Sequence, residues 1–143
     1  MMPLSLSEAQ TIVSTVLSKA HEMGLKPLTV AVLDSGGHLK ALAREDGTST
    51  LRPEIAQGKA RGAISMGLGS RALFERAQKE PFFIQAMNTL SHGSLVPVPG
   101  GVLIRREGEI IGAVGVTGDS SSNDEICAVY AIEKAGYSAD TGG

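Results

Sequence analysis

Aromatic residues, cysteine and long apolar runs are scarce in this chain of 143 residues. Aromatic residues make up 3% of it and there is no Trp, so platforms for stacking bases or sugars are few. The single cysteine, Cys127, excludes an internal disulfide and a cysteine-cluster metal site, and it suits a reducing compartment. No run approaches the ~18 apolar residues that a membrane span needs. These absences predict a cytoplasmic soluble domain with no membrane partner.

The charge balance gives no indication of a nucleic-acid partner. The formal net charge is −2 and the Lys and Arg residues are scattered, whereas a nucleic-acid footprint needs a basic stripe. The first ten residues have neither a basic start nor a continuous apolar segment, so no signal peptide is expected. With no repeat or linker, residues 1–143 are predicted to form a single domain.

Two hairpins are predicted from short apolar runs separated by turn residues. The first joins residues 28–33 to 39–44 through a turn in which the Asp34 carboxylate is expected to accept hydrogen bonds from backbone amides. The second joins residues 102–104 to 110–116 through a charged turn. Glycines recur in this second hairpin, which marks a place where a helix, another backbone or a ligand comes close.

Helical spacing and capping residues predict the other elements. The helices are expected over residues 6–23, from Pro53, from Ser70 as a cap to about Gln78, from Pro81, and after a capping box of Ser122 and Glu125. The order is helix, hairpin, helices, hairpin, helix, which indicates an α+β fold.

Lys59 is the first candidate for a binding residue. It lies inside the small-residue stripe of its predicted helix, and a lysine there either extends its amine to water or pairs with an Asp, a Glu or an anionic ligand. Pro99, Gly100 and Gly101 form a rigid turn whose amides no side chain covers, so we interpret this turn as one wall of a site.

His21 is the second candidate. It lies at the edge of the apolar stripe of the first helix, a position that suits a metal or haem ligand or an ordinary boundary residue, and the sequence alone favours the boundary residue. The chain has no covalent-haem motif, phosphate loop, dinucleotide fingerprint or zinc pattern, and no Ser/His/Asp order that compels a hydrolase.

Several segments together resemble the GlcG/HbpS-like family, also labelled haem-degrading. They are residues 31–39 (AVLDSGGHL), 44–47 (REDG), 55–60 (IAQGKA), 99–101 (PGG) and 112–118 (GAVGVTG). The resemblance implies an antiparallel sheet of about five strands flanked by helices, with profilin/PAS-like layering, and association into a homo-oligomer, a dimer or larger. The matching residues are mostly turn and cap residues, which suggests a fold signature more than an active site.

The resemblance also implies a function. The family includes haem-binding proteins that use a histidine ligand, and His21 matches a first-helix position used for this purpose. The first hypothesis is therefore a non-covalent binder of haem or a related tetrapyrrole, acting as carrier, sensor or cofactor-accessory protein. His21 would ligate the iron, and Lys59, Arg44 or Arg52 would meet the propionates.

Two alternatives stay open from the residues alone. Lys59 and the Pro99-Gly100-Gly101 turn could hold a short organic acid such as a glycolate-like carboxylate, in a binding protein or a small enzyme, although no acid–base pair identifies a reaction. The chain could also be an oligomeric scaffold without catalysis.

Overall fold

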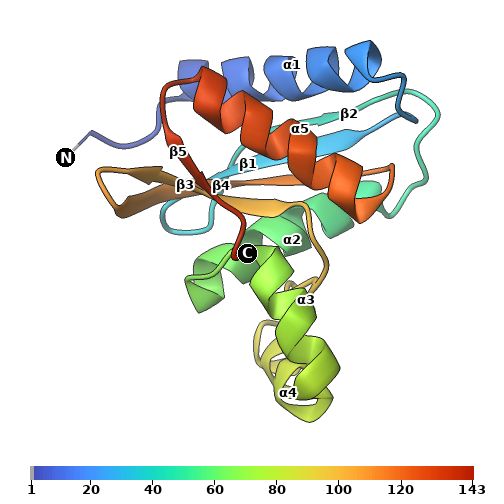
Figure 1. Cartoon of the computed structure of the whole chain (residues 1–143), viewed down its shortest axis with the longest axis vertical. Helices are drawn as coiled ribbons and strands as arrows, with labels where there is room; N and C mark the ends of the chain where they lie inside the picture. Colours follow the sequence, from blue (N-terminus) through green and yellow to red (C-terminus); the bar gives the residue numbers. More distant parts are fainter. Residues whose placement is uncertain (1) are drawn as a thin grey trace.

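One antiparallel sheet lies between two helical layers in a computed structural model, which describes residues 2–143 (Figure 1). The elements are α1 (Leu6–Glu22), β1 (Thr29–Asp34), β2 (Leu39–Arg44), α2 (Arg52–Met66), α3 (Ser70–Lys79), α4 (Pro81–Leu90), β3 (Gly101–Arg106), β4 (Glu109–Thr117), α5 (Ser121–Lys134) and β5 (Ser138–Asp140). The strand order is β2-β1-β4-β3-β5. This confirms the predicted α+β class, both hairpins and the five-stranded antiparallel sheet.

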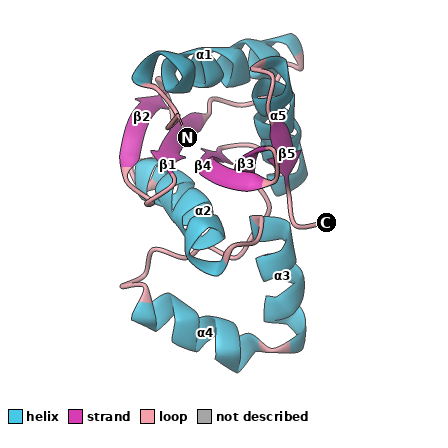
Figure 2. Cartoon of the chain, turned by 90° about the vertical axis from the view of Figure 1, so that its left-hand side faces the viewer, coloured by secondary structure: helices cyan, strands magenta, loops and turns pink. Residues whose placement is uncertain are grey.

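The two faces of the sheet are covered by different helices. Val30 and Val32 of β1 and Val114 of β4 pack in one core with α1 and α5. Residues one step along the same strands, Leu33 and Ala113, pack in a second core with α2. This alternation is the period of two expected of strands buried on both faces, and Figure 2 shows α1 and α2 on opposite sides of the sheet.

Two paired glycines allow α2 to lie against the sheet. Gly101 and Gly115 are opposite each other in the β3–β4 register. A Cβ at Gly115 would lie 1.9 Å from the Ala56 carbonyl oxygen, and one at Gly101 would lie 2.2 Å from the Lys59 carbonyl oxygen. The glycines of this hairpin therefore mark the close approach of a helix backbone, one of the three causes expected from the sequence.

Helices α3 and α4 form an arm below the sheet (Figures 1 and 2). The two helices pack around a small core of Leu73, Ile84 and Leu95, and the partly buried Phe83 and Met87 pack against this core. Within residues 2–143, no helix combines the length and the apolar character needed to cross a membrane.

Two predicted helix caps are wrong. Helix α3 is preceded by Gly69, and the buried Ser70 hydroxyl accepts a hydrogen bond from the Gly101 N–H at 2.7 Å instead. The last helix is capped by Ser120, which accepts from the Asn123 N–H, rather than by Ser122. The Glu125 side chain does not complete a capping box. It forms an ion pair with Arg71, whose Nε lies 3.0 Å from Glu125 Oε2.

Candidate functional site

A surface groove of about 380 Å³ lies where the end of α1 meets the end of β2. It is lined by His21, Leu25, Pro27, Arg44, Glu45 and Asp46. The groove thus brings together two of the residues selected from the sequence, His21 and Arg44. It combines an imidazole, a guanidinium and two carboxylates with two apolar side chains.

The His21 imidazole is exposed and held in place by Glu45. Its side chain is 68% exposed, and its Nε2 lies 2.6 Å from Glu45 Oε2. The other carboxylate oxygen, Oε1, accepts from the Leu28 N–H at 2.7 Å, so the start of β1 fixes the carboxylate. With the Nε2 proton donated to Glu45, the lone pair is on Nδ1, which has no hydrogen-bond partner among residues 2–143. A carboxylate in this position orients a histidine for a metal.

Arg44 supplies the positive charge of the groove. It is the last residue of the edge strand β2, and its Nη1 donates to the Thr48 carbonyl at a long 3.4 Å. In the described part of the chain, no carboxylate forms an ion pair with this guanidinium. Arg44 is therefore available to an anionic group of a ligand.

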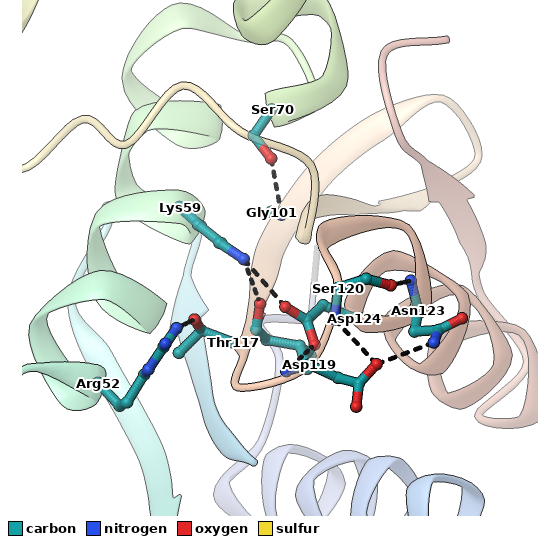
Figure 3. Close-up of polar contacts among 10 residues, drawn as sticks. Arg52, Lys59, Ser70, Gly101, Thr117, Asp119, Ser120, Asn123 and Asp124 are labelled. Carbon is teal, nitrogen blue, oxygen red and sulfur yellow. Dashed lines mark hydrogen bonds and ion pairs between the residues drawn. The ribbon is translucent and has the colours of Figure 1, made fainter. Parts of the chain in front are cut away.

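The structure separates Lys59 from this groove and buries it between α2 and the sheet. Its Nζ donates to the Val116 carbonyl at 2.9 Å and lies 3.3 Å from Asp124 Oδ2 (Figure 3). The exposed fractions of the Lys59 and Asp124 side chains are 2% and 1%. Of the alternatives left open for this lysine, pairing with an acidic residue is confirmed, and contact with haem propionates in the groove is not supported.

Burial dominates the electrostatics of this pair. It lowers the pKa of Lys59, against the raising effect of the neighbouring Asp124 charge. It also raises the pKa of Asp124, against the lowering effect of Lys59. Asp124 Oδ1 accepts a further hydrogen bond from the Asp119 N–H at 3.0 Å. The pair therefore links α2 to the end of β4 and the start of α5.

The Pro99-Gly100-Gly101 turn lies beside Lys59, as the sequence led us to expect, but the protein itself uses the Gly101 N–H and the Gly100 carbonyl. Gly101 N–H donates to Ser70 Oγ, and the Gly100 carbonyl accepts from the Val116 N–H at 2.9 Å. A carboxylate held by both Lys59 and the Gly101 N–H would have to displace Asp124 and Ser70. The geometry gives this location a structural role.

A larger groove, about 450 Å³, follows the outer surface of α1 and α5. Its two cations, Lys19 and Lys134, lie 4.6 and 5.6 Å from the Tyr130 ring centroid, and its other lining groups are mainly hydroxyls. It offers no imidazole. Elsewhere, His38 is 83% exposed, and within residues 2–143 no three His, Cys, Asp or Glu side chains gather as a metal site.

Glu45 is a residue of the groove that the sequence does not indicate, because the motif Arg44-Glu45-Asp46-Gly47 has the composition of a turn. Glu45 directly follows the edge strand β2 and lies opposite His21 at the end of α1. This placement would have predicted the contact, but it requires knowing that α1 ends beside β2, which only the tertiary structure shows.

Asp119 gives a prediction for acid stability. The Asn123 side chain, followed by the amides of Lys26 and Ser120, lowers its pKa from 3.8 to about 2 by donating hydrogen bonds to the carboxylate. Because the folded-state pKa is below the unfolded one, this stabilisation is complete above about pH 4 and is lost as the pH falls towards 2.

We therefore expect the free energy of unfolding of Asp119→Asn to fall less between pH 4 and pH 2 than that of the wild type. Urea denaturation at each pH measures the difference. The exposed Asp46, which accepts no hydrogen bond from residues 2–143, gives the control Asp46→Asn. A constant gap between wild type and Asp119→Asn across this pH range would contradict the assignment.

The sheet, the two helical layers and the histidine groove define a small α+β domain with a ligand-sized surface site. A family model described as "Haem degrading protein HbpS-like" matches residues 4–133. The chain belongs to this family, which confirms the resemblance found in the sequence. It is also 33% identical over 112 residues to Protein GlcG of Escherichia coli K12, covering 76% of this chain and 80% of that protein.

Solved structures share the fold at lower sequence identity. One described as a PduOC:heme complex has a TM-score of 0.85 at 23% identity and covers 95% of this chain and 97% of its own. A double mutant of HbpS from Streptomyces reticuli has a TM-score of 0.79 at 23% identity, with 94% and 88% covered. At these identities the likeness establishes the architecture.

Proposed function

We propose that this protein binds haem or a related tetrapyrrole non-covalently in the groove at the end of α1, where His21 would ligate the iron, and acts as a carrier, sensor or cofactor-accessory protein. The observation that carries the proposal is the exposed His21 imidazole, fixed through Nε2 by Glu45 with Nδ1 facing no protein partner. A family described as haem degrading and a neighbour solved with haem support the choice of ligand.

The residues of the groove fit this group. Histidine is a common protein ligand of haem iron, and Glu45 fixes the orientation of the imidazole. Leu25 and Pro27 offer apolar contacts to the macrocycle, and Arg44 offers a charge-assisted hydrogen bond to a propionate. When bound, haem would supply the redox and ligand-binding chemistry of its iron.

A haemin titration followed by absorbance tests the proposal. We expect a saturable, stoichiometric Soret shift for the wild type and its loss in His21→Ala. His38→Ala is the matched control, since His38 is equally a surface histidine but lies in the β1–β2 turn, and it should titrate as the wild type does. A Soret shift unchanged in His21→Ala would remove His21 as the ligand.

A thermal-shift series with short organic acids tests the alternative that Lys59 and the Pro99-Gly100-Gly101 turn bind a carboxylate. Glycolate and related short acids should leave the melting temperature unchanged, because the amine of Lys59 and the amide of Gly101 already have protein partners. Stabilisation by a short acid, lost in Lys59→Met and accompanied by no haemin shift, would overturn the proposal.

A further inference from the structure

A cavity of about 230 Å³ lies between α2 and the segment that joins α4 to β3. It is lined by Glu54, Gln57, Arg61, His92, Gly93 and Ser94, none of which lines the His21 groove. The joining segment follows α2 closely, since the Val96 N–H donates to the Gly58 carbonyl at 3.1 Å (Figure 2). The cavity is smaller than the ~300–1,000 Å³ of typical ligand pockets, so it suits a small molecule.

Arg61 presents a fixed guanidinium to this cavity. Its Nε donates to the Gly37 carbonyl at 3.2 Å, and its Nη1 donates to Ser94 Oγ at 2.8 Å. Within residues 2–143, no carboxylate forms an ion pair with Arg61, and its Nη2 has no hydrogen-bond acceptor. A guanidinium that is oriented in this way and lacks a counterion is suited to bind an anionic group.

The wall opposite α2 is formed before a ligand binds. The N–H groups of His92 and Gly93 donate to carbonyls at the end of α4, at 3.1 and 2.8 Å, so the protein itself uses these amides. His92 has a φ of 55°, a conformation uncommon for a residue other than glycine. Ser94 Oγ accepts from Arg61, which leaves its own hydroxyl proton free to be donated. Side chains therefore supply the donors of this wall.

The cavity also has an acidic end. Glu54, Gln57 and Arg61 lie three and four residues apart, so they occupy one side of α2. Glu54 and Arg61 are about two helical turns, or ~10.5 Å, apart along the axis. Glu54 is exposed, and no cation forms an ion pair with it in the described part of the chain. The cavity thus offers a carboxylate and a guanidinium at two separate positions, with the Gln57 amide between them.

We propose that this cavity binds a small zwitterion, namely an amino acid whose ammonium and carboxylate are separated by a short aliphatic chain. The ligand's carboxylate accepts from Arg61 Nη2 and the Ser94 hydroxyl, and its ammonium donates to Glu54. An α-amino acid carries both charges on one carbon and reaches only one of these positions. A simple anion such as glycolate satisfies Arg61 but leaves Glu54 without a cation.

Calorimetric titrations with γ-aminobutyrate and with butyrate test the proposal, because the two acids have the same chain length and differ in the ammonium. We expect saturable binding of γ-aminobutyrate with an affinity at least about tenfold higher than that of butyrate. In ¹⁵N-resolved NMR spectra, γ-aminobutyrate should shift the amide signals of Gly93 and Ser94. Equal affinities for the two acids, or no saturable binding of γ-aminobutyrate at millimolar concentration, would overturn the proposal.

Two variants assign the ends of the ligand. Glu54→Gln should lower the affinity for γ-aminobutyrate to that for butyrate, whereas Glu133→Gln, at an exposed glutamate of α5, should change neither affinity. Arg61→Gln should abolish binding of both acids. Glu54→Gln keeps the test valid if loss of the Arg61 contacts impairs folding, because the Glu54 side chain has no hydrogen-bond partner among residues 2–143.

A Glu54→Gln variant that still prefers γ-aminobutyrate would show that the ammonium does not meet Glu54 and would overturn the proposal. The haemin titration of Glu54→Gln should match that of the wild type, since the His21 groove contains none of the residues that line this cavity. The two ligands therefore report separately on this proposal and on the proposed function.

Discussion

Lys59→Met should lower the free energy of unfolding by about 3–5 kcal/mol, because it leaves the Asp124 carboxylate buried without its cation. The carboxylate is 1% exposed and Lys59 Nζ lies 3.3 Å from it, so water cannot replace the lost charge without rearrangement of α2. The Val116 carbonyl loses its donor in the same variant. Urea denaturation at neutral pH measures the loss.

Removing the second charge should recover part of this loss. In Lys59→Met/Asp124→Asn the amide oxygen can still accept the Asp119 N–H, and no unpaired charge stays in the core. The double variant should therefore be more stable than Lys59→Met. A matched ion pair near the surface, Arg105 with Asp140, gives the comparison, since both side chains are about a third exposed and Arg105→Met should cost less than about 1 kcal/mol. Additive losses in the double variant would show that the charges are not coupled.

Gly115→Ala should destabilise the protein by about 1–3 kcal/mol or more, because the added Cβ has no space. It would lie 1.9 Å from the Ala56 carbonyl oxygen, which is helix backbone and cannot rotate away as a side chain does. Helix α2 would have to move from the sheet and disturb the Lys59 pair. Thermal denaturation measures this loss.

Gly62→Ala is the control for Gly115→Ala. Gly62 lies on α2 itself, and its added Cβ would lie 3.1 Å from Leu95 Cγ and 3.2 Å from Leu95 Cα, so a small shift of Leu95 relieves the contact. Alanine in a helix also gains up to about 1 kcal/mol over glycine. We expect Gly62→Ala to cost less stability than Gly115→Ala, and equal losses in the two variants would contradict the role assigned to the Gly101–Gly115 contact.

Local pattern was sufficient to predict most of this fold. The apolar spacing of residues 6–23 gave α1 to within one residue, and Asp34 Oδ1 accepts from the amides of Gly36 and His38 as an Asx turn predicts. The strand β5, Ser138–Asp140, was not located, because three residues without apolar alternation carry no local signal. Its position depends on pairing with the edge of β3.

The candidate site was predicted only in part, because local pattern indicates burial but not which distant residues come into contact. The stripe position of Lys59 indicated burial, and a carboxylate partner was one of the predicted outcomes. The partner is Asp124, which is 65 residues away in the chain. The sequence does not identify it, because the contact depends on how α5 packs on β4. In contrast, the sequence indicated only weakly that His21 is a ligand. An imidazole at the edge of an apolar stripe is distinguished from an ordinary boundary residue only by its contact with Glu45, 24 residues away.

Family-matching residues occur at two separate locations. Lys59, Gly101 and Gly115, together with Asp124, join α2, the sheet and α5 in a buried structural centre. Arg44 and Asp46 border the open groove with His21. We infer that the first location serves folding, and we propose that the second binds the ligand.

A parallel haemin titration of the wild type, His21→Ala and Lys59→Met/Asp124→Asn tests this division most directly. We expect the double variant to give the wild-type Soret shift and affinity, although its stability is changed, and His21→Ala to give no shift. A folded double variant that fails to bind haemin, together with a His21→Ala variant that still binds it, would contradict the account and place the ligand at the buried pair.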